Sequence, residues 1–200
     1  MDLRGSVALV TGAAGPIGAA VSTRLASLGA SVAVLDRRPA AVAHQITGSG
    51  GHVLALTGDP DDPTAVRAAV GRLLTAWERI DIVVIPSPGT GIAGVGSVAQ
   101  AVAGFLPEAA RTGSRGVADL VVIDGAGAPD RFQVAAEQSV EAFCDSLRQE
   151  LAGQPVRVEL VRSAAVRNDP AGDGTQHVTE EVVRLIGRPA AAVLAARAAG

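Results

Sequence analysis

The stretch VALVTGAAGPIGAAVSTRLASLGASVAVLD, from Val7 to Asp36, contains the pattern that decides the fold. An apolar run ends in a glycine-rich turn, a helical pattern follows from Pro16 to Leu28, and a second apolar run closes on Asp36. Glycines at such a turn let the backbone approach a pyrophosphate at the helix N-terminus. A carboxylate that closes the second strand can accept hydrogen bonds from a ribose. The stretch therefore predicts the nucleotide-facing part of an α/β sheet.

The rest of the chain repeats the alternation of short apolar runs and longer helical patterns. Continuous apolar strands separated by helices are typical of a parallel sheet that is covered on both faces. We therefore expect a doubly wound, Rossmann-type α/β fold with about six strands, as a single domain over residues 1–200. The expected strands are residues 7–12, 31–36, 52–56, 82–85, 120–124 and 156–161.

Several helix boundaries can be predicted from capping residues. Asp62 and Pro63 are expected to be the N-cap and first residue of a helix that ends at Trp77. Thr179 is expected to cap a later helix, and residues 97–111 and 134–152 to form two more. The irregular stretch 167–177 is a candidate lid, and residues 185–200 suit either an Ala-rich helix or a short strand.

The composition excludes several function classes. The chain has no Lys and no Tyr, so it cannot supply a Schiff-base amine, a phosphate-loop lysine or a phenolic general acid. Its net charge of −3 and 2% aromatic content argue against nucleic-acid binding. We expect no metal site, no membrane association and a cytoplasmic location, with Cys144 as a small core residue.

The motifs resemble those of the short-chain dehydrogenase/reductase family across most of the chain. The resemblance rests on TGAAGPIG (11–18), Asp36, Asp59 in TGDPDD, and DSLRQELAG (145–153). It implies a nicotinamide cofactor, with NAD favoured over NADP by Asp36, although the adjacent Arg37 and Arg38 leave a 2′-phosphate open. One departure is Pro16, which stands where the family has its middle glycine. The cofactor-binding residues that the resemblance implies are Gly12, Gly15, Ile17, Gly18, Asp36, Arg37 and Asp59.

The chemical half of the family pattern is replaced. The family's catalytic Tyr and Lys fall on Gln133 and Glu137, and its catalytic Ser falls where this chain reads Asp124 and Gly125. An amide cannot exchange the substrate proton, and a carboxylate would not activate a phenolate. We therefore do not expect hydride transfer by the family mechanism.

Three functions remain open. The first is a non-catalytic subunit, or pseudo-oxidoreductase, with residual NAD(P) binding. It would form homo- or hetero-oligomers with an active family member through helices 97–111 and 134–152. The second is a non-redox isomerase, dehydratase or cyclase that uses Asp124, Glu137 or His177 as acid and base. The third is an atypical NAD(P)-dependent oxidoreductase. For Glu137 the competing interpretation is a solvated helix face shared with other acidic residues at four-residue spacing.

Overall fold

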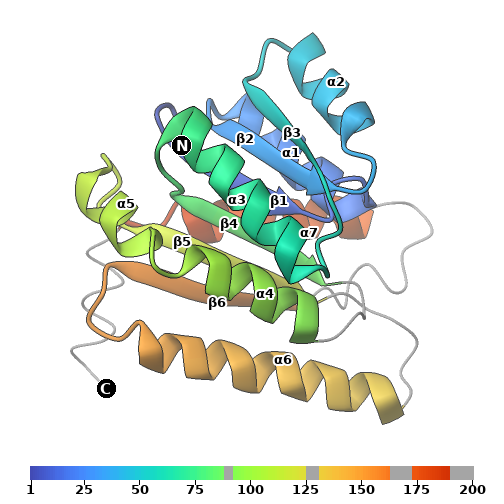
Figure 1. The fold of residues 1–200 in the computed structure, drawn as a ribbon, viewed down its shortest axis with the longest axis vertical. Helices are drawn as coiled ribbons and strands as arrows, with labels where there is room; N and C mark the ends of the chain where they lie inside the picture. The colour runs from blue at the N-terminus through green and yellow to red at the C-terminus, as the bar shows by residue number, and fades with distance from the viewer. Residues whose placement is uncertain (88–91, 125–130, 163–172, 190–200) are drawn as a thin grey trace.

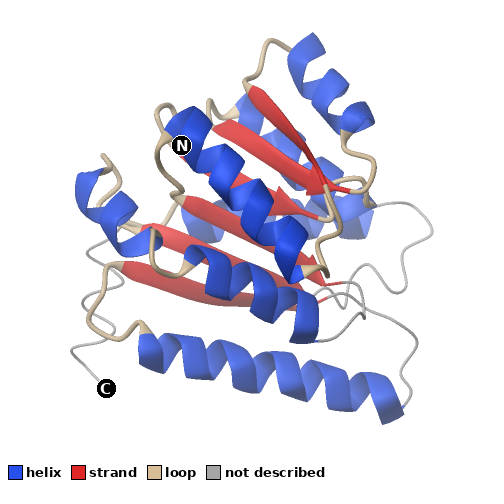
Figure 2. Ribbon diagram, in the orientation of Figure 1, coloured by secondary structure: helices blue, strands red, loops and turns tan. Residues whose placement is uncertain are grey.

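The computed structural model describes residues 1–87, 92–124, 131–162 and 173–189. Six parallel strands form one sheet in the order β3-β2-β1-β4-β5-β6, with helices on both of its faces (Figures 1 and 2). This confirms the predicted doubly wound α/β fold. The strands are β1 (Val7–Thr11), β2 (Ser31–Asp36), β3 (Val53–Thr57), β4 (Ile82–Ser87), β5 (Ala118–Asp124) and β6 (Val156–Arg162). The helices are α1 (Pro16–Ser27), α2 (Ala40–Gly48), α3 (Pro63–Trp77), α4 (Ile92–Val102), α5 (Leu106–Thr112), α6 (Arg131–Glu150) and α7 (Asp173–Ile186).

The two faces of the sheet carry separate apolar layers. Side chains of α1, α2 and α7 pack on one face, and those of α3, α4, α5 and α6 pack on the other. All five residues of β1 are buried, which explains why its sequence is continuously apolar rather than alternating. The layers are built from Val, Leu, Ile and Ala, as the low aromatic content requires.

The strand order reverses direction next to β1. From β1 the chain moves outward through β2 to β3, and then returns to β4 on the other side of β1. In open α/β sheets a crevice forms at such a switch point, outside the carboxyl ends of the strands. The loops after β1 and β4 therefore diverge and leave room between them.

The predicted start of α3 is confirmed. The Asp62 side chain accepts a hydrogen bond from the Thr64 backbone N–H at 2.9 Å, and Pro63 opens the helix, where its missing N–H costs nothing. The helix ends at Trp77 as predicted, and Glu78 closes it in the left-handed conformation with φ of 61°.

The prediction that Thr179 caps a helix is wrong. Helix α7 begins at Asp173, and the Thr179 hydroxyl donates to the Thr175 carbonyl at 2.8 Å inside the helix. Residues 173–177 of the predicted lid are thus helical, whereas residues 167–172 lie outside the described residues, as do residues 190–200 of the C-terminal stretch. The apolar face that packs α7 on the sheet begins at Val178, but the helix extends one further turn ahead of that face.

The helix predicted over residues 97–111 is two helices. Helix α4 ends at Val102, and α5 begins at Leu106. Pro107 lacks an N–H, and in a continuous helix its ring would clash with the Ala103 carbonyl, so the chain turns before it.

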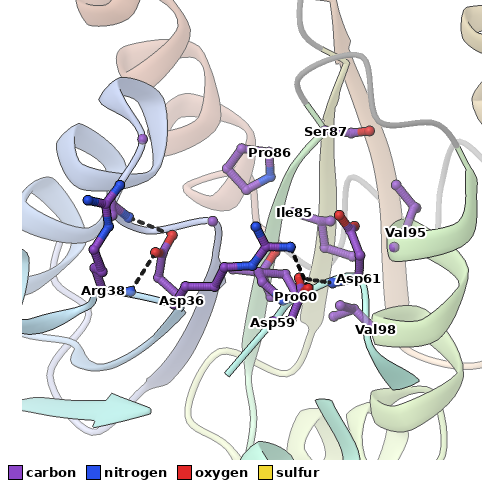
Figure 3. Close-up of a pocket in the computed structure, with 16 residues that line it drawn as sticks. Asp36, Arg38, Asp59, Pro60, Asp61, Ile85, Pro86, Ser87, Val95 and Val98 are labelled. Atoms are coloured by element: carbon purple, nitrogen blue, oxygen red, sulfur yellow. Dashed lines mark hydrogen bonds and ion pairs between the residues drawn. The ribbon is translucent and has the colours of Figure 1, made fainter. Parts of the chain in front are cut away.

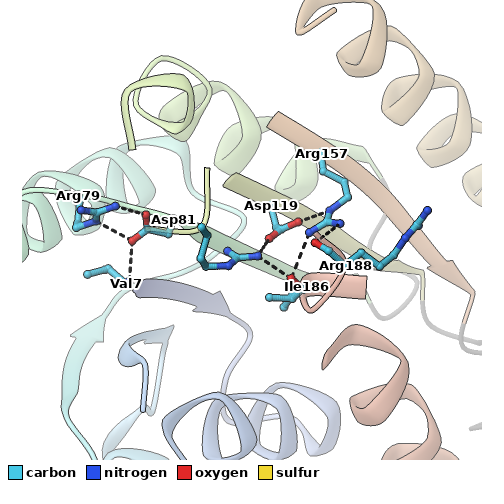
Figure 4. A network of polar contacts seen from close by, with 8 residues as sticks. Val7, Arg79, Asp81, Asp119, Arg157, Ile186 and Arg188 are labelled. Carbon is cyan, nitrogen blue, oxygen red and sulfur yellow. Dashed lines mark hydrogen bonds and ion pairs between the residues drawn. The ribbon is translucent and has the colours of Figure 1, made fainter. Parts of the chain in front are cut away.

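A buried ion-pair network lies at the amino end of the sheet (Figure 4). Arg157 donates from Nε to Asp119 at 2.5 Å, and Arg115 donates to the other oxygen of the same carboxylate. Both guanidinium groups also donate to the Ile186 carbonyl, at 3.2 and 2.7 Å, so they satisfy the last carbonyl of α7. Nearby, Asp81 accepts from the Val7 backbone N–H at 2.8 Å and pairs with an arginine that follows α3. These contacts tie the end of α7 to β5 and β6, and they hold the start of β1 to the residue just before β4.

Strand β6 is the last strand of the sheet among the described residues, and one of its outward carbonyls accepts a side-chain hydrogen bond. Pro155 O accepts from Ala118 N at 3.0 Å, so alternate residues after it, including Val158, point away from β5. The Val158 carbonyl accepts from Arg148 Nε of α6 at 2.9 Å.

Candidate functional site

The crevice at the strand switch point is a pocket of about 410 Å³ (Figure 3). It opens at the carboxyl ends of β1, β2, β3 and β4, which is where the doubly wound topology predicts a ligand site. The lining residues combine a glycine turn, a charged rim and an apolar wall. They are Thr11, Gly12, Ala14, Gly15, Asp36, Arg37, Arg38, Asp59, Pro60, Asp61, Ile85, Pro86, Ser87, Gly94, Val95 and Val98.

The glycine turn is tight because its glycines permit it. Gly12 has a φ of 58°, in the left-handed region that other residues rarely adopt. A Cβ atom on Gly18 would lie 2.4 Å from the Gly12 carbonyl oxygen and 2.8 Å from Ala13 Cα. Gly18 therefore allows α1 to sit directly against the turn, while Gly12 and Gly15 line the pocket itself.

The first turn of α1 presents backbone donors. The Gly15 N–H donates a hydrogen bond to the Gly12 carbonyl at 3.1 Å, and Pro16 has no N–H. The amides of Ile17 and Gly18 come before Ala19, the first residue of this turn that donates to a carbonyl of the helix cap. Among the described residues these two amides have no acceptor, so they can bind an anion at the positive end of the helix.

The Asp36 carboxylate joins the end of β2 to the glycine turn by a hydrogen bond. One carboxylate oxygen accepts from the Ala14 N–H at 3.0 Å, and the other accepts from the Arg38 N–H at 2.9 Å. Figure 3 shows Asp36 lying between Arg38 and Asp59 at the rim. Each oxygen keeps a second lone pair, so the carboxylate can also accept from a ligand hydroxyl.

Asp59 and Arg37 form an ion pair at the same rim. Arg37 Nη2 lies 2.5 Å from Asp59 Oδ2, and the other Asp59 oxygen accepts from the Asp61 N–H at 3.0 Å. The hydrogen bond from Arg37 is the main cause that lowers the pKa of Asp59, and the same contact raises the pKa of Arg37. Both groups therefore remain charged at neutral pH.

The opposite wall of the pocket is apolar and was not predicted. Val95 and Val98 project from α4 toward Ile85 at the end of β4 (Figure 3). At Gly94 a Cβ atom would lie 2.2 Å from Asp61 Oδ1, so the glycine lets the β3–α3 loop approach α4. The sequence feature that could have predicted this wall is the uncharged run after β4, in which valines recur at helical spacing among small residues.

The structure does not bring the three predicted acid–base residues together. Asp124 lies at the carboxyl end of β5, opposite Ser87 in register, and is partly buried. His177 is exposed on α7, whereas Glu137 belongs to α6, on the other face of the sheet, in a part of that helix whose side chains lie outside the described residues. None of the three lines the pocket, so their catalytic role stays a prediction.

Other reactive side chains are accounted for. Cys144 is buried in the apolar layer beneath α6, as predicted, and burial raises the pKa of its thiol to about 11. His44 and His52 are exposed. No group of three or more His, Cys, Asp or Glu side chains in the described part of the chain could hold a metal ion. The helices of that part include none that is both long and apolar enough to cross a membrane.

Solved structures share this fold. A metagenomic short-chain oxidoreductase in complex with NADP superposes with a TM-score of 0.78 at 23% identity, covering 94% of this chain and 93% of that one. A short-chain type dehydrogenase/reductase from Mycobacterium marinum gives a TM-score of 0.71 at 26% identity, over 80% and 75% of the two chains. Fold and pocket together define a Rossmann-type α/β protein.

The sequence comparisons point to one family. Residues 6–104 match the family model described as short chain dehydrogenase. Cyclohexanol dehydrogenase of Rhodococcus sp. is 38% identical over 112 residues, which cover 48% of this chain and 40% of that enzyme. D-threitol dehydrogenase of Mycolicibacterium smegmatis is 40% identical over 85 residues, 41% of this chain and 33% of that enzyme. Residues 6–104 thus match the short-chain dehydrogenase/reductase family, and the chain matches less than half the length of these two curated relatives.

Proposed function

We propose that this protein is a nicotinamide-dinucleotide-binding member of its family that does not transfer hydride by the family mechanism and acts as a non-catalytic subunit. One observation carries the binding half of the proposal. Asp36, Asp59 and the glycine turn that leads into α1 line a single crevice at the strand switch point, and the unbonded amides of Ile17 and Gly18 follow directly after that turn. Pyrophosphate suits the helix N-terminus, and ribose hydroxyls suit the Asp36 carboxylate.

The ligand that suits the pocket best is NAD, with NADP weaker. Asp36 provides acceptors for a free 2′-hydroxyl and would repel a 2′-phosphate. The apolar wall of Val95, Val98 and Ile85 suits the flat face of an adenine. The metagenomic short-chain oxidoreductase of similar fold was solved in complex with NADP, which supports a nicotinamide dinucleotide as the ligand.

The non-catalytic half of the proposal comes from α6. Gln133 and Glu137 stand in this helix where the family pattern has its proton-transferring Tyr and the Lys that activates it. A neutral amide has no titratable proton at any working pH, and the chain has no Tyr or Lys to substitute elsewhere.

The proposed partner is a second copy of this chain or an active relative, bound along α4, α5 and α6. An apolar patch would be the usual sign of such a surface, but the described outward face of α6 is polar. The association would therefore depend on hydrogen bonds and charge complementarity rather than on apolar burial. The exposed residues on this face are Gln138, Ser139, Glu141, Ala142, Asp145, Ser146, Gln149 and Glu150.

Two measurements test the proposal. Titration calorimetry of the purified chain should show NAD⁺ or NADH binding, and NADH should show no oxidation with a panel of small ketones and aldehydes. Native mass spectrometry from the source host should show the chain in a complex with itself or with a Tyr- and Lys-bearing relative. Absence of dinucleotide binding would refute the binding half. Steady oxidation of NADH with any of these substrates would refute the non-catalytic half.

A further inference from the structure

Three consecutive rim residues decide how the pocket meets the 2′-position of an adenosine. Asp36, Arg37 and Arg38 all line the pocket at the end of β2. The carboxylate at this place is suited to the 2′-hydroxyl, so a 2′-phosphate would sit beside it and would need a neighbouring guanidinium to neutralise it.

The two arginines differ in their availability. Arg37 Nη2 is bonded to Asp59 Oδ2 at 2.5 Å, and Asp59 is held in place through the Asp61 N–H on its other oxygen. The Arg38 backbone N–H donates to the Asp36 carboxylate. The Arg38 guanidinium makes no ion pair within the described residues. For Arg37 to reach a phosphate it would have to leave Asp59, and a second unpaired carboxylate would then face the same anion.

We propose that Asp59 is a specificity-determining residue, which withholds Arg37 from 2′-phosphates and thereby makes the pocket select adenine dinucleotides with a free 2′-hydroxyl. This inference rests on the proposed dinucleotide binding and deepens it. Asp59 acts through Arg37, so it is a positioning residue for this selection. The ion pair joins the β2–α2 and β3–α3 loops across the rim, and 70% of the Arg37 side chain is exposed, so the guanidinium is free to rotate once released.

The readout is the ratio of NADP⁺ to NAD⁺ affinity, measured by titration calorimetry on the full chain. Because both ligands carry the same adenine, any contact that Asp59 makes with the base cancels in the ratio. Asp59→Asn should raise the ratio about two- to fivefold, the range expected for releasing an exposed ion pair. Asp61→Asn removes an equal charge from the same rim without breaking the pair, and should raise the ratio less.

A double-mutant cycle assigns the effect to Arg37. Adding Arg37→Gln to Asp59→Asn should remove the gain, whereas adding Arg38→Gln should lower NADP⁺ binding but leave the gain from Asp59→Asn in place. Thermal unfolding of each variant confirms that it is folded.

The outcomes separate the two proposals. Binding of NAD⁺ with a ratio that Asp59→Asn does not change, or a gain that persists without Arg37, would overturn the role of Asp59 alone. Failure of every variant to bind either dinucleotide would overturn the proposed function, and this inference with it.

Discussion

At the amino end of the sheet Asp119 and Arg157 are 1% and 4% exposed and bond each other, while at the carboxyl end Arg37 is 70% exposed beside an open pocket. The first pair lies among strands and the end of α7, where an unmatched charge would be costly. The second pair is more exposed, at 70% for the Arg37 and 33% for the Asp59 side chain, so its separation costs less. The comparison shows that charge at one end of this sheet fixes the fold, whereas charge at the other end remains available to a ligand.

The largest expected effect breaks the amino-end network. Asp119→Ala leaves the guanidinium groups of Arg115 and Arg157 buried without their carboxylate, and should lower the free energy of unfolding by about 3–5 kcal/mol. Urea unfolding followed by circular dichroism measures this loss. Asp145→Ala, which removes a carboxylate from an exposed pair with Arg148, is the matched control and should cost below about 1 kcal/mol. Equal costs for the two variants would contradict the comparison.

The next largest effect concerns the packing of α1 against the glycine turn at the carboxyl end of the sheet. Gly18→Ala places a Cβ atom 2.4 Å from the Gly12 carbonyl oxygen, so α1 must move away from the turn at a cost of about 1–3 kcal/mol. The displaced helix should also bind NAD⁺ more weakly in calorimetry. Gly71→Ala in α3, where no atom lies within 4 Å of the added Cβ, should instead stabilise the fold by about 0.5–1 kcal/mol. If Gly18→Ala is also neutral or stabilising, the proposed close packing of α1 is wrong.

A smaller change in stability should accompany a larger change in binding at Asp36. Asp36→Ala releases the N–H groups of Ala14 and Arg38, both near solvent, and should cost about 1 kcal/mol of stability. It should weaken NAD⁺ binding about tenfold, since a charged acceptor for the ribose is lost. Asp62→Ala removes the N-cap of α3 at a similar cost of about 1 kcal/mol, but Asp62 does not line the pocket, so affinity should not change. Equal affinities of the two variants would remove Asp36 from the site.

The smallest effect concerns an ion pair at the carboxyl end of the sheet that lies outside the pocket. Arg162 pairs with Glu141 at 2.5 Å, with both side chains about half exposed. Arg162→Gln should cost about 0.2–1 kcal/mol, and the cost should shrink further in high salt. A loss as large as that of Asp119→Ala would mean that exposure does not separate the two kinds of pair.

The sheet and half of the pocket could be predicted from the sequence because they depend on local patterns. The apolar strands, the glycines of the turn and the Asp62 cap each act over a few residues. The apolar wall and the Arg37–Asp59 pair could not be predicted, because they join segments that only the folded sheet brings together. The break before Pro107 was predictable from proline geometry, but the small apolar residues around it suggested one continuous helix.

The bond from Arg148 to the Val158 carbonyl also has a consequence for behaviour in concentrated solution. The last strand of a sheet is a template on which strands of other molecules can add, one backbone bond at a time. On β6 the Val158 carbonyl already accepts a hydrogen bond from the Arg148 side chain, which also brings a positive charge to the edge. We expect this to hinder edge-to-edge pairing of β6 with strands of neighbouring molecules. The chain should therefore aggregate less at high concentration than a variant in which this carbonyl is unbonded.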